Sequence, residues 1–463
     1  MKKLQIHSYD SVWTVCDQPT AVLLNREFSF EVEYWISTYR GKKKVKSRKY
    51  LIEARNKGEH FFHTGLVPRA LKYLKSEGKK VNYTSDIKPV EYDGPYIPGI
   101  KFRKFQKEAF KNVLSNGRGV IKAPTGTGKT IVIAGLVSCF SSENILILIH
   151  TTDLINQTIE ELNGFGLHCT EYSGKKKQIS RITVATIQSF KNVVKEYADY
   201  YDVVVVDETH HASSLTGSYA KVLSQLTAPV KLGTTATLPY KEEAKWSLES
   251  LIGPVISEYK IAEAQVDRIL AKPEIVVYKT PRVDSRILDS STGINNRKDG
   301  TEPTKYVRHY HNGVVWNTSR NFLIAEIAKK YIKEKKTVLI SVVNVVHGRN
   351  ISKLIKGCVF VHGATSKEDR EEIKEKFIKK EIKCVVATVV WQEGLNIPSL
   401  DVCVLAGSGK SDIKVVQGIG RGLRKTKGKD KVIIIDFDDS DISKYLKNHY
   451  EMRNKIYKKM NWI

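Results

Sequence analysis

Runs of apolar residues recur along most of the chain and alternate with segments of helical character. Residues 145–149 and 203–206 are apolar at every position, which is typical of strands buried on both faces of a parallel sheet. The pattern restarts near residue 320, with further apolar runs at 337–343, 384–387, 402–405 and 432–435. Strands that alternate with helices indicate α/β architecture. We therefore expect two α/β domains in tandem, at residues 100–280 and 319–440.

The first 93 residues follow a different pattern. Residues 28–35 alternate apolar and polar positions, as a half-buried strand does. Residues 41–46 are rich in lysine and are expected at a hairpin tip. A helix is expected to begin near Pro68 and to end near Gly78. Residues 1–93 are therefore predicted to form a small α+β module.

Three further segments connect or extend these domains. Residues 94–99 are rich in glycine and proline, which indicates a linker. Residues 281–318 are polar and interrupted by glycine and proline, and an inter-domain insert or linker of this length is typically a functional loop or disordered. The tail, residues 441–463, is basic, and we expect it to be a helix that packs on the second domain.

The charge of the chain suggests a partner. Its 463 residues include 76 Lys and Arg against 50 Asp and Glu, a formal net charge of +26, and such a field attracts polyanions such as nucleic acid. From charge alone, a generically basic protein remains the alternative. The excess is spread along the chain, so it indicates no particular binding face. In residues 1–93, lysine and aromatic residues interleave, which fits either an accessory DNA-binding domain or a solvated structural cap.

Cysteine spacing and hydropathy give no sign of a zinc site, a disulfide framework or a membrane segment. The six cysteines are scattered without metal-ligand spacing. No run approaches the ~18 apolar residues that span a bilayer, and the first residues lack the apolar region of a signal peptide. We therefore expect a cytoplasmic protein that does not bind a membrane.

Residues 123–130 have the composition of a phosphate-binding loop. They follow the apolar run 119–121 and precede a helical segment, which is the order of strand, loop and helix that such a loop requires. Backbone N–H groups of this loop surround phosphates, Lys129 neutralises their charge, and the Thr130 hydroxyl binds Mg²⁺. The first position is Ala123, where the strict pattern has glycine. The candidate nucleotide contacts are Thr125, Gly126, Thr127, Gly128, Lys129 and Thr130.

Two carboxylates follow the buried strand at 203–206. Parallel sheets bind ligands at the carboxyl ends of their strands, which is where Asp207 and Glu208 are expected. Asp207 is a candidate magnesium ligand, and Glu208 is a candidate general base that polarises the attacking water. Together with the phosphate loop, this pair predicts hydrolysis of ATP with Mg²⁺ as the cofactor.

These two motifs resemble motifs I and II of the superfamily 2 helicases, in the DExH branch. The resemblance implies tandem RecA-like motor domains. It also implies that Arg103 and Gln106 read the adenine base, and that the sequence at 235–237 couples hydrolysis to domain movement. The nucleic-acid strand is expected to contact Thr151, Gln157, Thr186, Gln188 and Thr388.

The second half of the site is expected in the second domain. Gln417, Arg421 and Arg424 fit Q-x-x-G-R-x-x-R, motif VI of the same superfamily. Arginines three positions apart lie on one helix face and can stabilise the γ-phosphate charge. Residues 393–398 resemble motif V, which implies nucleotide contacts by Gly394 and Asn396. Asn396 stands where the family commonly has Asp, which replaces a charged contact by a neutral amide.

The order of a small N-terminal module and two motor domains resembles the phage branch-migration helicases of the UvsW type, with XPB-like and restriction-subunit translocases as relatives. This resemblance implies 3′ to 5′ movement on forked, branched or single-stranded DNA in replication, recombination or repair. It also implies function as a monomer, in the host cytoplasm if the chain is phage-encoded. Two alternatives remain: a duplex-DNA translocase that does not separate strands, and an RNA-acting DExH protein or nucleotide-switched RNA-binding module.

Overall fold

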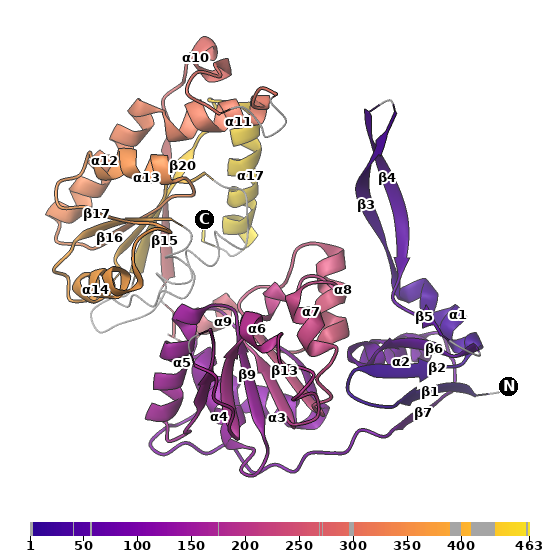
Figure 1. The fold of residues 1–463 in the computed structure, drawn as a ribbon. Coiled ribbons are helices and arrows are strands. Elements are labelled where there is room, and N and C mark those ends of the chain that lie inside the picture. The colour runs from indigo at the N-terminus through magenta and orange to yellow at the C-terminus, as the bar shows by residue number, and fades with distance from the viewer. Residues whose placement is uncertain are drawn as a thin grey trace. The chain divides into compact units, whose positions relative to one another are not determined.

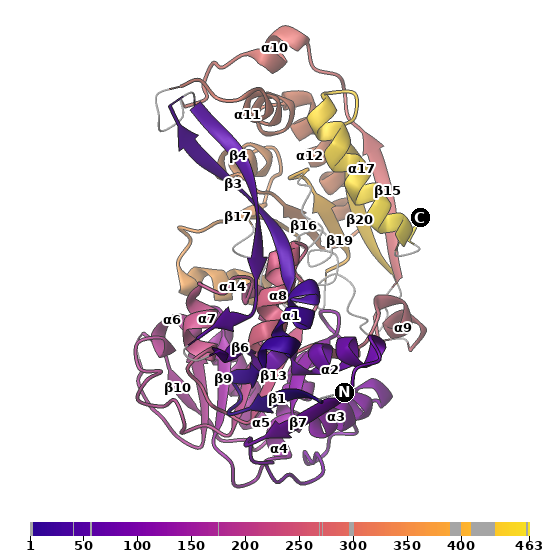
Figure 2. The same ribbon diagram turned by 90° about the vertical axis from the view of Figure 1, so that its right-hand side faces the viewer.

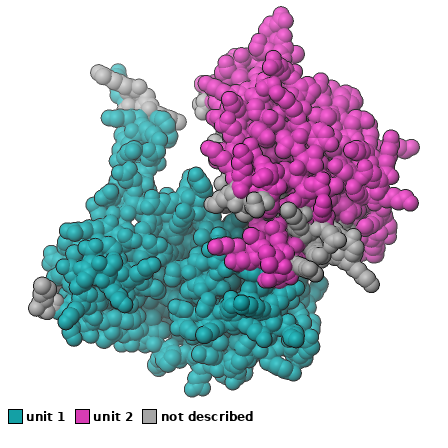
Figure 3. Space-filling model, turned by 180° about the vertical axis from the view of Figure 1, so that it is seen from behind, with its two compact units in different colours: residues 1–123, 128–259 teal, residues 124–127, 260–463 magenta. Residues whose placement is uncertain are grey.

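The computed structural model describes most of the chain as two compact units. The described residues are 3–39, 41–55, 58–174, 176–267, 269–270, 272–295, 301–388, 400–408, 431–459 and 462–463. Unit 1 consists of residues 1–123 and 128–259, and unit 2 of residues 124–127 and 260–463 (Figure 3). Unit 1 contains the N-terminal module and a seven-stranded sheet, whereas unit 2 contains a six-stranded sheet (Figure 1).

The N-terminal module is a mixed five-stranded sheet with two helices. Its strands, in sheet order, are β5 (Glu53–Ala54), β6 (His60–His63), β2 (Trp13–Cys16), β1 (Leu4–Ser8) and β7 (Val81–Ser85). The helices α1 (Gln18–Glu27) and α2 (Val67–Ser76) bury Leu24 and Leu74 in its core. The predicted helix from Pro68 is confirmed as α2, which has proline in its first turn and is followed by Gly78 at φ 66°.

A two-stranded ribbon, β3 (Ser29–Thr38) and β4 (Gly41–Tyr50), projects from this module (Figures 1 and 2). The predicted strand at 28–35 is confirmed. The expected hairpin tip at 41–46 is wrong, because antiparallel pairing continues as far as Thr38 and Gly41 and these lysines lie within β4. The lysine-rich sequence of β4 is not typical of a strand, but cross-strand ion pairs, such as that between Lys44 and Glu33, stabilise it.

The seven-stranded sheet of unit 1 is parallel throughout. Its order is β10 (Thr170–Tyr172), β11 (Ile182–Thr186), β9 (Ile145–Ile149), β12 (Val203–Val206), β13 (Val230–Thr235), β8 (Arg118–Lys122) and β14 (Val255–Glu258). Every residue of β9, β11 and β12 is buried, as the unbroken apolar runs of β9 and β12 predict. The connecting helices are α3 (Lys104–Asn116), α4 (Lys129–Ser138), α5 (Thr152–Gly164), α6 (Ile187–Phe190), η3 (Thr209–His211), α7 (Ser218–Leu223) and α8 (Glu242–Leu251).

The N-terminal module packs directly on this sheet and on α8. Arg69 of α2 makes two hydrogen bonds to the carboxylate of Glu249, at 2.8 and 2.7 Å, and its guanidinium lies 4.7 Å from the ring of Trp246. The buried Arg118 and Lys231, at the amino ends of β8 and β13, both donate to the carbonyl of one module loop. The module is therefore held against the body of unit 1 by charged groups as well as by apolar contact.

The six-stranded sheet of unit 2 is also parallel. Its order is β15 (Lys272–Lys279), β20 (Lys431–Asp438), β19 (Val402–Leu405), β16 (Val338–Ser341), β18 (Cys384–Ala387) and β17 (Val359–Val361). Its helices include α9 (Ile261–Val266), α12 (Thr318–Lys333), α13 (Val345–Ser352) and α14 (Lys367–Ile378). The expected first domain extended to residue 280, but β15 pairs with β20 and so belongs to the second sheet. This pairing joins segments 159 residues apart, which local sequence cannot reveal.

The segment at 281–318 contains helices where a loop or disorder was expected. These are α10 (Ser285–Asp289), α11 (Lys305–Tyr310) and a π-helical turn, η4 (His311–Val315). Leu288 and Val314 pack on Ile442 and Leu446, and the amide of Asn312 donates to carbonyls of the α10 region. For its described residues the expectation is therefore wrong, because burial against the chain's tail orders this segment.

The basic tail forms α17 (Lys444–Lys459), as expected, and packs on the second sheet (Figure 1). Arg453 makes a buried ion pair with Asp436 of β20 at 2.9 Å, and Tyr457 donates to the same carboxylate at 2.8 Å. Trp462 is also buried. Within the described ranges, no helix is both long enough and apolar enough to cross a membrane.

Candidate active site

The loop between β8 and α4 has a backbone that only glycine adopts easily. Gly126 and Gly128 have φ values of 86° and 92°, in the left-handed region. Gly128 is the N-cap of α4, so the free N–H groups of this ten-residue helix lie at the end of the loop. A Cβ atom at Gly128 would lie 3.2 Å from Nε2 of Gln106. Backbone shape and helix polarity therefore both suit a phosphate.

The side chains of this loop divide into two kinds. Thr127 is fully buried, and its hydroxyl donates to the carbonyl of Pro124 at 2.7 Å, so its side chain stabilises the loop itself. Thr125, Lys129 and Thr130 are partly exposed. Of the predicted contacts in the loop, these three side chains are the ones accessible to a ligand.

Asp207 and Glu208 lie at the carboxyl end of β12. Oδ1 of Asp207 accepts hydrogen bonds from the hydroxyl of Thr234 at 2.6 Å and from the backbone N–H of Glu208 at 2.9 Å. Glu208 has a left-handed backbone, with φ 48° and ψ 50°. This conformation costs a non-glycine residue about 1–2 kcal/mol. The structure tolerates strain at the residue predicted to be the general base, as is common at functional sites.

The pKa values of the two carboxylates shift in opposite directions because their surroundings differ. Burial raises the pKa of Asp207, and the neighbouring carboxylate of Glu208 raises it further. Burial also acts to raise the pKa of Glu208, but Lys129 and His210 outweigh it and hold this pKa below its usual range. Nζ of Lys129 lies 3.3 Å from Oε1 of Glu208. Lys129 is thus the lysine paired with Glu208.

His210 joins the carboxylates to the threonines that follow β13. Its Nδ1 lies 3.2 Å from Oε2 of Glu208 and 3.1 Å from Oγ1 of Thr235. Thr235 in turn donates to the carbonyl of Thr237 at 2.8 Å. The sequence at 235–237, expected to couple hydrolysis to movement, therefore contacts the carboxylate pair through one imidazole.

Sequence reasoning did not assign Thr234 or His210 to the site. Thr234 immediately precedes the motif at 235–237, on a strand that ends beside Asp207. His210 is the fourth residue of the sequence that starts at Asp207. Their positions beside known motifs were the available signal, but the hydrogen bonds that define their roles join separate strands.

Gln106 contacts the phosphate loop. This residue is 1% exposed; its Oε1 accepts from the backbone N–H of Arg103 at 2.8 Å, and its Nε2 donates to the carbonyl of Gly128 at 3.5 Å. Arg103 is exposed at the start of α3. The predicted adenine element thus ties the start of α3 to the end of the phosphate loop, a contact that spacing alone did not predict.

The predicted strand contacts of unit 1 lie beside these groups. β9 and β11 are parallel neighbours, so Thr151, Thr186 and Gln188, which end or follow them, lie at the same carboxyl edge as the phosphate loop and Asp207.

The accessibility of these residues differs. Thr151 is partly exposed and Gln188 is exposed, whereas Thr186 is 3% exposed and caps α6 by accepting from the N–H of Ser189. Gln157 donates to Glu161 at 2.8 Å on the surface of α5. Thr151 and Gln188 are therefore the better placed of the four to contact a strand directly.

One predicted residue of unit 2 lies among the described residues. Thr388 follows β18 and is 5% exposed. The other predicted residues of the second half-site lie outside the described residues: Gly394, Asn396, Gln417, Arg421 and Arg424.

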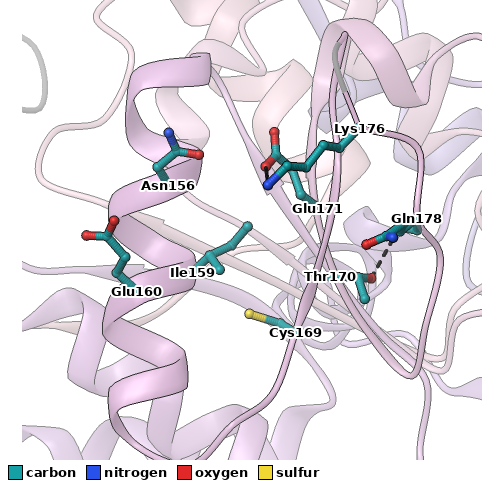
Figure 4. A pocket seen from close by; sticks show the side chains of 8 residues that line it. All are labelled: Asn156, Ile159, Glu160, Cys169, Thr170, Glu171, Lys176 and Gln178. Atoms are coloured by element: carbon teal, nitrogen blue, oxygen red, sulfur yellow. Dashed lines mark hydrogen bonds and ion pairs between the residues drawn. The ribbon is translucent and has the colours of Figure 1, made fainter. Parts of the chain in front are cut away.

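A surface hollow of about 390 Å³ lies between α5 and the loop around β10 (Figure 4). Asn156 and Glu160 line it from the helix, and Lys176, paired with Glu171 at 3.5 Å, lines it from the opposite side. None of the predicted site residues is among those that line it. The candidate site is therefore the carboxyl edge of the sheet and not this hollow.

A phosphate loop and a carboxylate pair at the edge of one parallel sheet, followed by a second parallel sheet, define a class of nucleotide-hydrolysing motor. Residues 99–240 match the family model described as the type III restriction enzyme, res subunit, and residues 320–426 match that of the helicase conserved C-terminal domain. The chain belongs to the superfamily 2 helicases, and it is an ATPase of that superfamily.

Curated relatives agree with this class, and a solved structure shares the fold. The chain is 29% identical to the DNA 3′-5′ translocase XPB2 of Sulfurisphaera tokodaii, over 72% of this chain and 81% of the relative. It is 26% identical to the ATP-dependent DNA helicase uvsW of Enterobacteria phage T4, over 73% of this chain and 68% of the relative. The DNA-bound structure of the DUF1998 helicase MrfA covers 80% of this chain and 52% of its own, with 18% identity and a TM-score of 0.57, and it shares the fold.

Proposed function

We propose that the chain is an ATP-dependent DNA helicase that moves 3′ to 5′ and unwinds or branch-migrates forked or four-way DNA in replication, recombination or repair. The arrangement of the seven-stranded sheet carries this proposal. The predicted nucleotide contacts follow β8, β12 and β13, and the predicted nucleic-acid contacts of this sheet follow β9 and β11. All of these strands end at the same carboxyl edge of the sheet. The names of two relatives, a DNA 3′-5′ translocase and an ATP-dependent DNA helicase, support DNA as the partner and the direction of movement.

In this proposal the described residues bind and hydrolyse ATP. The loop N–H groups and Lys129 hold the phosphates, which draws Lys129 away from Glu208 and frees that carboxylate to polarise water. Thr130 and Asp207 offer the hard oxygen ligands that Mg²⁺ prefers, and such ions commonly bind one or two carboxylates plus substrate phosphates. Mg²⁺ would neutralise phosphate charge there. Arg421 and Arg424 are proposed to stabilise the γ-phosphate during transfer.

The exposed side chains of the ribbon formed by β3 and β4 (Figure 2) are a second argument for a branched DNA substrate. Side chains alternate between its faces, so Trp35 lies across from Lys44, beside Lys46 on the same face, and Tyr34 lies across from Val45 on the other face. Trp35 is 65% exposed and Tyr34 is 47% exposed. Basic residues that contact phosphates and exposed rings that stack on bases are the two means by which proteins bind unpaired strands. We propose that residues 1–93 form the accessory DNA-binding domain and that the protein acts as a monomer.

Strand release from a forked duplex and from a four-way junction tests this function. The helicase reading predicts ATP-dependent release of labelled strands from both substrates, which Lys129→Ala abolishes. A triplex-displacement assay in parallel examines the alternative translocase. Displacement of the third strand without release of any strand from the forks would replace the helicase reading with translocation along duplex DNA.

A further inference from the structure

Three histidine rings form a stack between Thr151, a predicted nucleic-acid contact, and the carboxylate pair. His150 follows β9 and immediately precedes Thr151, whereas His210 and His211 belong to η3, after β12. The ring centroids of His150 and His211 are 3.7 Å apart, with the ring planes inclined by 7°. The ring of His210 lies 4.3 Å from that of His211 and is tilted against it by 33°, and Nδ1 of His210 lies 3.2 Å from Oε2 of Glu208.

The register of the sheet brings these rings together. β9 and β12 are parallel neighbours in which Leu148 is paired with Val206, and the N–H of Asp207 donates to the carbonyl of Leu148 at 3.0 Å. The segments that follow the two strands therefore leave the sheet side by side.

A tyrosine from α7 supports the stack from another direction. Oη of Tyr219 lies 3.4 Å from Nδ1 of His150, and its ring is nearly parallel to those of His150 and His211, at 20° and 15°. Tyr219 is 5% exposed. The preceding residue, Ser218, lies 3.5 Å from Oε1 of Gln188, which is the exposed candidate contact after β11. Of the two accessible candidate contacts for nucleic acid in unit 1, Thr151 is next to His150 in the sequence, and Gln188 contacts Ser218, which is next to Tyr219.

We propose that His150 is a positioning residue that transmits occupancy of the strand edge to Glu208 through the rings of His211 and His210. A nucleic-acid phosphate bound at Thr151 moves the end of β9 and the adjoining His150 ring. The stacked rings then move His210 relative to Glu208. This inference rests on the proposed function, because it requires a strand at Thr151.

At the end of the stack, a small movement of His210 relative to Glu208 changes the electrostatic energy of that carboxylate. Glu208 is partly buried between Lys129 and His210, and the energy of a charge interaction changes more steeply with distance at such a site than in water. The energy of one close ring pair corresponds to about a two- to tenfold change in rate. We therefore expect loss of the His150 ring to lower the strand-stimulated rate by about that factor.

Two substitutions of His150 and one control test this role. His150→Ala removes the ring, whereas His150→Phe retains a ring of similar size without its nitrogens. His168→Ala changes an exposed histidine of the same unit that lies outside the cluster. The kcat and the KM for ATP are measured without DNA and with saturating forked DNA, together with the Kd for that DNA and the midpoint of thermal unfolding.

The inference predicts that His150→Ala lowers the ratio of stimulated to unstimulated kcat by about two- to tenfold, while the Kd for DNA and the KM for ATP change less than about twofold. His150→Phe should retain most of the stimulation, and His168→Ala should retain all of it. Unchanged stimulation in His150→Ala would overturn the inference, as would equal loss in both His150 variants, or loss that follows the Kd for DNA. A wild-type protein that no DNA stimulates would overturn the proposed function instead.

Discussion

At the scale of single residues, Glu208 combines a strained backbone with two charged or polar contacts. Its backbone occupies the left-handed region, and its carboxylate contacts both Lys129 and His210. A carboxylate paired with lysine is a weaker base, so a phosphate that competes for Lys129 would make Glu208 a stronger one. The residue predicted to activate water is therefore also one that the nucleotide-free protein restrains.

This arrangement predicts different consequences for the two partners. Glu208→Gln preserves the shape of the side chain but removes the base, so kcat should fall by about 10²- to 10⁴-fold while ATP still binds. Lys129→Ala should abolish both hydrolysis and tight ATP binding. Steady-state ATPase rates and binding of a fluorescent ATP analogue distinguish these outcomes. Normal turnover in Glu208→Gln would remove Glu208 from the general-base role.

At the scale of elements, the short turn before α2 seats the N-terminal module on α8. An added Cβ at Gly65 would overlap the backbone carbonyl oxygens of Glu249 and Ser250. Gly65→Ala should therefore destabilise this contact by about 2 kcal/mol or more and lower the midpoint of thermal unfolding. Gly94→Ala is the matched control, because a Cβ there meets no atom within 4 Å. Equal melting of both variants would show that the module is not docked through this turn.

His63, on β6 of the same module, predicts a pH dependence of stability. Burial lowers its pKa from 6.5 to about 4, and the nearby Lys231 contributes in the same direction. Between these values the unfolded chain binds a proton that the folded chain does not, so this stability is present above pH 6.5 and lost as pH falls toward 4.

Urea unfolding at pH 7 and pH 5 measures this effect. The wild type should lose roughly 2 kcal/mol more than His63→Gln between the two conditions, because only the wild type carries the titrating ring. The same loss in both proteins would assign the pH dependence to other groups.

The elements that sequence predicted well are those whose signal is local. The runs at 145–149 and 203–206 are strands because residues apolar at every position must be buried on both faces. The candidate phosphate loop could be predicted from sequence because its glycines and Lys129 lie within one short stretch of the chain. The lysines of β4 were misread, since the pairing with β3 that stabilises them depends on a separate strand. The ring stack at His150 was invisible for the same reason: it joins the ends of two strands.

At the scale of the whole molecule, we propose that residues of both motor domains act on one nucleotide. Lys129, Asp207 and Glu208 belong to unit 1, whereas Arg421 and Arg424 lie outside the described residues. If these arginines stabilise charge that develops during transfer, Arg421→Ala or Arg424→Ala should lower kcat by at least about 100-fold with little change in the KM for ATP. A rise in KM at constant kcat would instead indicate that they bind ATP in the ground state.

The central claim is that this ATPase is a DNA-driven motor, and the most direct measurement is the ATPase rate of the full chain with different nucleic acids. Single-stranded DNA, duplex DNA, forked DNA and RNA of matched length would be compared, with Lys129→Ala as the inactive control. The account predicts strong stimulation by single-stranded and forked DNA, little by RNA, and a steep loss of stimulation as salt rises, since phosphate contacts dominate. Stimulation by RNA alone would contradict it.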